Sequence, residues 1–419
     1  MSVGAAILLR QLYPSVLAKT LGLTRNLPDA EDAVQDAVER ALAMWSESGM
    51  PETPEAWLVT VAGNAYRDRL RRRKREDPSG DALETLAAMS PWARIALGEP
   101  EVARGWKDEL LRLLFACCHP GLDEGESAAL ALATVVGMST AEIAAAFVVA
   151  PRSMEQRLTR ARQRLRERGD YEGTAPEASL DRVPAVLRAI HLLFNEGYWS
   201  TNDDGPIRGD LCRLAIGLAR SLLAAFPSMP EVAGLVALLL LHDARRGARL
   251  DSDGSAVPLP DQDRTRWDHG AITAATDLLE RALRTETPGP FQIEAAIAAV
   301  HCRARRADDT DWREIAALYG ILETVRPIPA VRVNRAFATA RADGAAAGLA
   351  LLEARAEIDA SSYPYFHLVR GTLLGELGRT EEARLSMLEA ERHARNASEH
   401  TQIRARIEAL GGPGIENAS

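Results

Sequence analysis

The chain has few cysteines, few aromatic residues and almost no lysine. Its 419 residues include four cysteines, none in a Cys-x-x-Cys pair, and the adjacent Cys117 and Cys118 are poorly placed to bridge each other. Free thiols are typical of the reducing cytoplasm, so we expect a cytoplasmic protein rather than a disulfide scaffold. Aromatic residues make up 5% of the chain, whereas Ala, Leu and Arg, which favour helices, are abundant.

No segment has the composition of a membrane span or a secretory leader. The longest apolar run, residues 232–241, is about half as long as a membrane helix needs to be. The N-terminal sequence has no basic stretch before an apolar core, which argues against a signal peptide. We therefore expect a soluble protein that does not bind a membrane.

Strand signals are missing as well. No alternating apolar pattern is present, and no Asn-Gly or Asp-Gly hairpin lies between β-branched runs. Apolar residues instead recur at spacings of three and four, which predicts an all-α fold. The chain is too long for one core. We expect two small helical domains joined by a linker and followed by a helical extension, at residues 5–75, 76–104 (the linker), 105–169 and 180–410.

Catalytic motifs are also absent. The sequence has no P-loop, no Gly-x-Gly-x-x-Gly after a strand and no Gly-x-Ser-x-Gly. His119 lies near Cys117 and Cys118, but four zinc ligands at workable spacing are not found. We therefore expect no catalytic residue, no cofactor and no metal, and a protein that is not an enzyme. An enzyme with a DNA-binding tail is an alternative that would need a chemical constellation.

What the chain does have is positive charge concentrated on one segment, although the net charge is −9. Ser139 and Glu142 form the sequence pattern of a capping box at the start of a short helix. After a break, Pro151 suits the first turn of a second helix. That second helix carries seven arginines within residues 152–168. Its apolar positions, expected to be buried, are Met154, Leu158, Ala161 and Leu165.

A short helix, a turn and an Arg-bearing second helix predict a helix-turn-helix. In this motif the first turns of the second helix face base edges, and outlying Arg side chains bind phosphates. The alternative is a solvated, Arg-rich helix in a bundle. The residues left on the outer faces are Arg152, Ser153, Gln156, Arg157, Thr159 and Arg160.

Two more helices are predicted near the N-terminus. Residues 27–45 read as a helix capped by Asp29, with an acidic outer face, which by itself is usually only a solvated surface. Its expected buried face consists of Ala30, Val34, Ala37 with Val38, Ala41 with Leu42, and Trp45. Residues 53–75 form an amphipathic helix in which seven of the last nine residues are basic. Such a block is commonly a phosphate-binding patch, although cations are also normal at a helix C-terminus.

The segments "DAEDAVQDAVERAL", "AWLVTVAGNAYRDRLRRRKR" and "RLTRARQRLRE", in this order, resemble a bacterial RNA polymerase sigma factor of the extracytoplasmic-function class, which keeps only regions 2 and 4. "IHLLFNEGYWS" and "LLLLHDARRGARLDSDGSAVPLPDQDRTRWD" resemble the subgroup with a large, tetratricopeptide-like C-terminal extension. The resemblance implies an alternative sigma factor that binds core RNA polymerase and directs promoter recognition and transcription initiation. A one-component helix-turn-helix regulator with a sensing repeat domain is the alternative.

The resemblance also implies three binding surfaces. Residues expected to dock the clamp helices of the polymerase β′ subunit are Asp29, Glu31, Asp32, Gln35 and Asp36. Residues expected to hold the non-template strand of the −10 element, together with the loop 46–54, are Asn64, Arg67, Arg69, Arg71 and Arg72. Residues expected to read the −35 element in the major groove are Arg152, Ser153, Gln156, Arg157 and Arg160.

The extension has a faint internal repeat, because Gly344 aligns with Gly378 at an offset of 34 residues, the period of tetratricopeptide helix pairs. The polar loop 251–264 is expected to cap helices and form Asp–Arg pairs; a site at residues 261–264, including a cation site, is the alternative. Histidines on apolar helices, among them His301, are expected to be core residues. We expect the extension to regulate or assist activity through a regulatory protein or a ligand.

Overall fold

The structure is a computed structural model of the 419-residue chain. It describes residues 3–76, 109–147, 149–168, 180–198, 207–252, 257–284, 288–354, 363–394 and 397–411. All regular elements in these ranges are helices, which confirms the expected all-α fold. None of the helices described is long and apolar enough to cross a membrane. The predicted linker, apart from its first residue, lies outside the described residues.

The chain divides into two compact units, unit 1 (residues 1–193 and 217–226) and unit 2 (residues 194–216 and 227–419). The division passes through two helices, α9 (Val183–Tyr198) and α10 (Gly209–Ala225). The other elements of unit 1 are α1 (Val3–Thr24), α2 (Leu27–Ser48), α3 (Pro54–Glu76), α5 (Glu109–Cys117), α6 (Glu124–Ala131), a π-helical turn (Leu132–Val136), α7 (Thr140–Ala146) and α8 (Pro151–Arg168).

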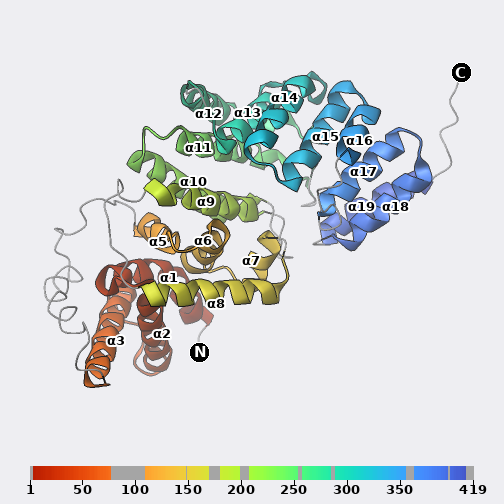
Figure 1. The fold of residues 1–419 in the computed structure, drawn as a ribbon. Helices are drawn as coiled ribbons and strands as arrows, with labels where there is room; N and C mark the ends of the chain where they lie inside the picture. The colour runs from red at the N-terminus through yellow and green to blue at the C-terminus, as the bar shows by residue number, and fades with distance from the viewer. Residues whose placement is uncertain are drawn as a thin grey trace, which may run out of the picture. The chain divides into compact units, whose positions relative to one another are not determined.

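Helices α1, α2 and α3 pack against one another at the start of unit 1 (Figure 1). The predicted apolar face of α2 is buried at Ala30, Val34, Ala37, Ala41 and Trp45, whereas Val38 and Leu42 are half-buried. The cap of this helix differs from the prediction: the N-cap is Asn26, whose side chain accepts a hydrogen bond from the backbone N–H of Asp29. Arg25 has a positive φ of 55°, so the chain turns sharply just before the helix and the cap falls three residues earlier than expected.

The second part of unit 1 contains the predicted helix-turn-helix. Ser139 and Glu142 form the expected capping box at the start of α7. Helix α8 begins at Pro151, and its four predicted apolar positions, from Met154 to Leu165, are buried. A second capping box, between Asp123 and Glu126, starts α6, which packs on α8. Helix α8 thus buries its apolar face against the rest of unit 1.

Unit 2 is a series of helices in which each packs on the next (Figure 1). Its elements are α11 (Pro230–Asp243), α12 (His269–Ala282), α13 (Pro290–Arg303), α14 (Trp312–Val325), α15 (Pro329–Asp343), α16 (Ala345–Glu353), α17 (Pro364–Glu376), α18 (Thr380–Arg392) and α19 (Ala397–Gly411), with short 3-10 turns at Arg246–Ala248, Leu259–Asp261, Arg264–Arg266 and Ala307–Asp309.

The two glycines that the repeat aligns occupy equivalent places in this series. Gly344 joins α15 to α16 with a φ of 98°, and Gly378 lies between α17 and α18 with a φ of 73°. Positive φ is accessible to glycine at little cost, so both turns need this residue. The offset of 34 residues therefore corresponds to two helical hairpins, each with a glycine of positive φ in its turn, although the first turn is the single residue Gly344 and the second spans residues 377–379.

Candidate nucleic-acid interface

The acidic face of α2 is engaged by arginines of two other helices. Glu31 accepts hydrogen bonds from Arg162 of α8, at 3.0 Å to Nε and 3.3 Å to Nη2, and one from the Thr134 hydroxyl at 3.4 Å. Asp32 forms ion pairs of 3.2 Å with both Arg69 and Arg166. Two of the five residues expected to dock polymerase therefore hold α2 against α8 in this structure.

The remaining residues of that set lie along the same helix. Asp29 is in the first turn of α2, where a carboxylate favours the helix dipole. Gln35 is exposed and donates to Glu39 on its own helix at 3.2 Å. Asp36 accepts a hydrogen bond of 2.8 Å from Arg69.

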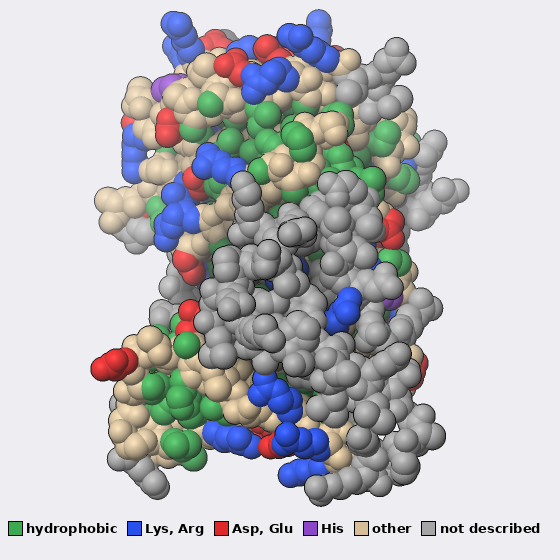
Figure 2. Space-filling view, turned by 90° about the vertical axis from the view of Figure 1, so that its left-hand side faces the viewer, with side chains coloured by type: hydrophobic (Ala, Val, Ile, Leu, Met, Phe, Trp, Pro, Cys, Tyr) green, Lys and Arg blue, Asp and Glu red, His purple; other side chains and the backbone are tan. Residues whose placement is uncertain are grey.

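The residues predicted for the −10 element divide into two groups on α3. Asn64, Arg71 and Arg72 are exposed, and Asn64 accepts a hydrogen bond of 2.7 Å from the half-buried Arg67. Arg69 points the other way: its guanidinium is shared by the carboxylates of Asp32 and Asp36 and the backbone carbonyl of Asp32. Figure 2 shows Lys and Arg side chains gathered along the lower edge, at the height at which Figure 1 places α3.

The residues predicted for the −35 element are brought together on the outer side of α8. Arg152, Ser153, Gln156 and Arg160 are exposed, while the apolar positions of the same helix are buried. The guanidinium of Arg157 lies 5.7 Å from the ring centroid of Phe147, at the end of α7, a cation–π distance that orients this side chain. The helix therefore presents a cationic, hydrogen-bonding surface in its first turns.

Three more arginines of α8 have roles that the sequence did not reveal. Arg162 and Arg166 bind the acidic face of α2, and Arg164 forms an ion pair of 2.5 Å with Glu126 of α6. Their spacing of two residues separates them by about 200° around a helix, so the two partners lie on different sides of α8. Only the position of the neighbouring helices distinguishes these three arginines, which have carboxylate partners, from the other arginines of α8.

The Glu31–Arg162 pair is partly buried. Burial lowers the pKa of Arg162, but the Glu31 carboxylate outweighs this effect, so the pKa is raised and the arginine stays charged. Burial, and then the charge of Glu31, raises the pKa of the nearby Tyr13 phenol. The pair is therefore a charged contact next to a neutral phenol at physiological pH.

No described residues form a group of three or more His, Cys, Asp or Glu that could hold a metal ion. His119 is used locally, because its Nδ1 accepts a hydrogen bond from the backbone N–H of Gly121. Burial raises the pKa of the Cys117 and Cys118 thiols, which disfavours the thiolates that zinc would need.

Comparisons with known families match three parts of the chain. Residues 8–76 match Sigma-70 region 2, residues 112–165 match Sigma-70 region 4, and residues 182–283 match a family of unknown function, DUF6596. No solved structure was found to match the chain.

Relatives extend these matches. The chain is 42% identical to an uncharacterized protein of Rhizobium meliloti over 400 residues, which are 95% of this chain and 93% of that protein. It is 28% identical to the ECF RNA polymerase sigma factor EcfG of Rhodopseudomonas palustris over 174 residues, 42% of this chain and 90% of that protein. It is also 28% identical to the ECF RNA polymerase sigma factor SigE of Mycolicibacterium smegmatis over 160 residues, 38% and 59% of the two chains.

A region 2 followed by a region 4 is the arrangement that the resemblance implies, and a plain helix-turn-helix regulator has no use for region 2. The chain therefore belongs to the extracytoplasmic-function family of bacterial RNA polymerase sigma factors, in a subgroup with a large helical C-terminal extension, and is an alternative sigma factor that directs promoter recognition and transcription initiation.

Proposed function

We propose that this sigma factor uses three helices of unit 1 for three different contacts. The acidic face of α2 docks the β′ clamp helices, the C-terminal half of α3 holds the −10 strand, and the first turns of α8 read the −35 duplex. The observation that carries the proposal is the outer face of α8, where four polar or cationic residues of the predicted set are exposed above a row of buried apolar ones.

Local charge explains how a chain of net charge −9 binds DNA. Phosphate binding depends on the cations near the backbone rather than on the sum over the whole protein. Arg71 and Arg72 on α3, and Arg152 and Arg160 on α8, are exposed cations in two separate patches. Each patch contacts a short piece of promoter, and core polymerase holds the two pieces in register.

The contact between α2 and α8 has to change when the protein binds polymerase. Glu31 and Asp32 cannot dock another protein while Arg162 and Arg166 occupy their carboxylates. Polymerase binding through these two acids therefore exchanges the internal ion pairs for external ones. Gln35, which is exposed, is available without such an exchange.

The domain boundaries follow the same division: residues 5–75 act as region 2, residues 76–104 as a linker, residues 105–169 as region 4 and residues 180–410 as the extension. The extension regulates or assists the sigma domains by contact, through a protein or ligand partner, and the protein performs no catalysis of its own. Because polymerase and promoter are its partners, its place of action is the cytoplasm.

Run-off transcription tests the function directly. Purified core polymerase, the full chain and the DNA upstream of its own gene should give a defined transcript that depends on the protein. Replacing Gln156 and Arg152 by Ala should abolish the transcript while leaving core association intact. Gln163→Ala, at an exposed position of the same helix outside the predicted set, is the matched control. DNA binding without association with core enzyme would instead indicate a one-component regulator.

The role of the extension is tested by truncation. Unit 1 includes residues 217–226, so the chain should be cut after residue 226 rather than near residue 180. Transcription from the same promoter should then change in either direction. An unaltered rate and promoter choice would remove the regulatory role and leave the sigma domains sufficient.

A further inference from the structure

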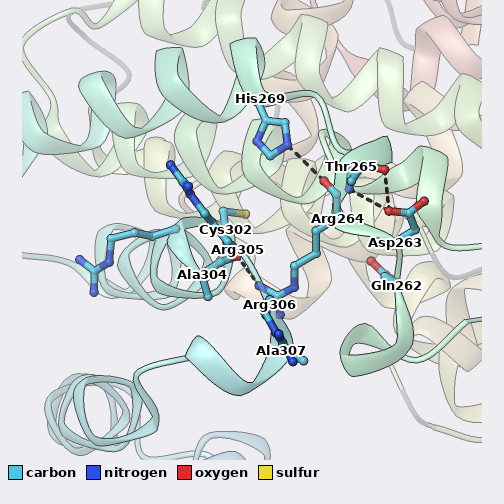
Figure 3. A pocket seen from close by; sticks show the side chains of 11 residues that line it. Gln262, Asp263, Arg264, Thr265, His269, Cys302, Ala304, Arg305, Arg306 and Ala307 are labelled. Carbon is cyan, nitrogen blue, oxygen red and sulfur yellow. Dashed lines mark hydrogen bonds between the residues drawn. The ribbon is translucent and has the colours of Figure 1, made fainter.

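Unit 2 contains a pocket of about 610 Å³ between the loop that precedes α12 and the C-terminal end of α13 (Figure 3). Residues 262–265 and His269 line one side, and residues 302–307 line the other. A volume between about 300 and 1,000 Å³ is typical of small-molecule sites. Neither the promoter contacts nor the polymerase contacts proposed above use this pocket.

The lining is strongly cationic. Four arginines contribute to it, Arg264, Arg303, Arg305 and Arg306, against one acid, Asp263. The carboxylate of Asp263 is occupied by the backbone N–H and the hydroxyl of Thr265. Within the described ranges, Arg305 has no hydrogen bond or ion pair, and it is exposed. Four lining arginines disfavour the cation site that the Asp-rich sequence of this loop had suggested as an alternative.

Arg264 is the central group of the pocket. It is 9% exposed, and its guanidinium lies 4.7 Å from the ring centroid of Trp267. Figure 3 shows its side chain reaching towards the end of α13, where Nη1 donates to the carbonyls of His301 and Ala304 at 2.8 and 2.7 Å. The expected Asp–Arg pairing is therefore not what this arginine makes. Its Nε and Nη2 have no hydrogen-bond acceptor among the described residues, so both groups can donate to a ligand.

Gln262 supplies a hydrogen-bond acceptor, whereas the arginines supply donors. Its side chain is 8% exposed, and its Nε2 donates to the carbonyl of Val257 at 3.1 Å. Its Oε1 is buried without a hydrogen-bond partner among the described residues. A buried, unsatisfied acceptor is costly, so a ligand that donates a hydrogen bond there would relieve the cost.

The surroundings strengthen the attraction for an anion. His301, whose carbonyl binds Arg264, has its pKa lowered to about 4 by burial and by the charges of Arg245 and Arg264. Burial, with a further contribution from Arg245, also lowers the pKa of Arg264. Arg245 is itself buried, with its Nε unpartnered among the described residues. Arg303 and Arg306 have carboxylate partners in Glu314 and Asp308. Arg264 and Arg305 form no ion pair among the described residues, so an anion would compensate the charge of these two.

We propose that this pocket of the extension binds a small metabolite that carries an oxyanion, a phosphate monoester or a carboxylate, next to a hydroxyl or amine. Arg264 and Arg305 bind the oxyanion, with Arg306 beside them, and Gln262 Oε1 accepts the hydrogen bond of the neighbouring donor. Arginine suits this task because its planar fork matches phosphate and carboxylate oxygens. The pocket makes the extension a candidate sensor, and its binding property stands whether or not the extension regulates transcription.

Calorimetric titration of the full chain tests the proposal. The probes are glycerol 3-phosphate for the phosphate arm, malate for the carboxylate arm and sulfate as an oxyanion without a donor, at constant ionic strength. One of the first two should bind saturably and more tightly than sulfate. Arg305→Gln and Gln262→Met should each weaken that binding by about tenfold, the loss expected for one charge-assisted hydrogen bond.

Arg305 and Gln262 are chosen because Arg264 also holds the end of α13, and its replacement would unfold this region. Arg392→Gln, which removes an exposed arginine of α18, is the control of equal charge and should bind as the unaltered chain does. Saturable binding by neither probe up to about 10 mM, above the weakest affinities common for small ligands, would overturn the proposal. Equal weakening by Arg392→Gln and Arg305→Gln would overturn it as well, since it would indicate general charge attraction.

Discussion

Arg162 of α8 donates two hydrogen bonds to the carboxylate of Glu31 of α2, from Nε at 3.0 Å and from Nη2 at 3.3 Å. The Glu31 side chain is 13% exposed, so the pair is shielded from much of the water that would screen a surface ion pair. Removing one partner of such a pair leaves a poorly solvated charge, which costs more than the pair itself contributes. This contact joins the helix proposed to bind polymerase to the helix proposed to read DNA.

We expect Arg162→Met to loosen α8 from α2. Amide hydrogen exchange of α8 in the full chain should accelerate by about tenfold, which corresponds to a loss of about 1.4 kcal/mol of local stability. Arg160→Met, on the exposed side of the same helix, should leave exchange unchanged. If Glu31→Gln and Arg162→Met had additive effects when combined, the two side chains would not be coupled.

A cation introduced on the acidic face of α2 should weaken polymerase binding. Gln35→Arg places a cation in the centre of the acidic face without breaking an ion pair, since among the described residues Gln35 hydrogen-bonds only to Glu39 of its own helix. Affinity for core polymerase should fall by about tenfold or more, because like charges across an interface are costly. Glu381→Arg, on the exposed side of α18, introduces a cation elsewhere and should bind normally. Equal binding by both variants would remove this face from the polymerase contact.

Base-edge contacts and phosphate contacts of α8 should have different effects on the affinity of the holoenzyme for DNA. Gln156→Ala should cost about 1–3 kcal/mol on the preferred −35 sequence and relax discrimination there, because a base-edge contact is lost. Arg160→Ala should weaken binding to all sequences alike and lower the salt dependence by about one counterion, as for a phosphate contact. Fluorescence anisotropy across a salt series measures both. The same salt slope for the Arg160→Ala variant and the unaltered protein would contradict the phosphate role.

His301 should make the extension acid-sensitive. Its pKa is about 4 in the folded chain against 6.5 for the free side chain, chiefly through burial and then through Arg245 and Arg264. Between these values the unfolded state binds more protons, so stability is complete above about pH 6.5 and falls as the pH drops towards 4. The loss can reach about 3 kcal/mol. The melting temperature of His301→Gln should vary less between pH 7 and 5 than that of the unaltered protein, and an equal variation would assign the sensitivity to other groups.

Gly348 should be intolerant of a side chain. A Cβ there would approach Ala340 and the carbonyl of Ala336 at less than 3.0 Å, so Gly348→Ala should separate α15 from α16 and cost about 1–3 kcal/mol. Gly217 is also inside a helix, α10, but nothing lies within 4 Å of its Cβ position. Gly217→Ala should therefore be neutral or stabilising by up to about 1 kcal/mol. Similar melting temperatures for the two variants would show that the close packing at Gly348 is not required.

Much of the fold could be read from local patterns. The capping box at Ser139 and the buried positions of α8 were predicted correctly because both depend on residues three or four apart, which a helix brings together by its own geometry. The N-cap of α2 was misplaced by three residues, because Asn26, which follows the positive-φ turn at Arg25, caps the helix in place of Asp29.

The binding sites were harder to predict from the sequence. The exposed arginines of α8 follow from the helical period, but nothing in the pattern of Arg157, Arg160, Arg162 and Arg164 tells which of them have partners. Arg69 was expected to face DNA and instead pairs with Asp32 and Asp36. The pocket of unit 2 was visible only as a polar loop, whose acids suggested the opposite charge.

The sequence by itself determined where helices form, which face of each is apolar and that residues 67–75 and 152–168 are two short cationic segments, since these depend on neighbours along the chain. The tertiary structure alone decided which charges are used internally. Glu31 and Arg162 are 131 positions apart, and their contact exists only because packing of apolar faces brings α2 and α8 together; the same holds for Arg264 and the end of α13. Electrostatic partners are chosen by proximity in space, and proximity is set by the core.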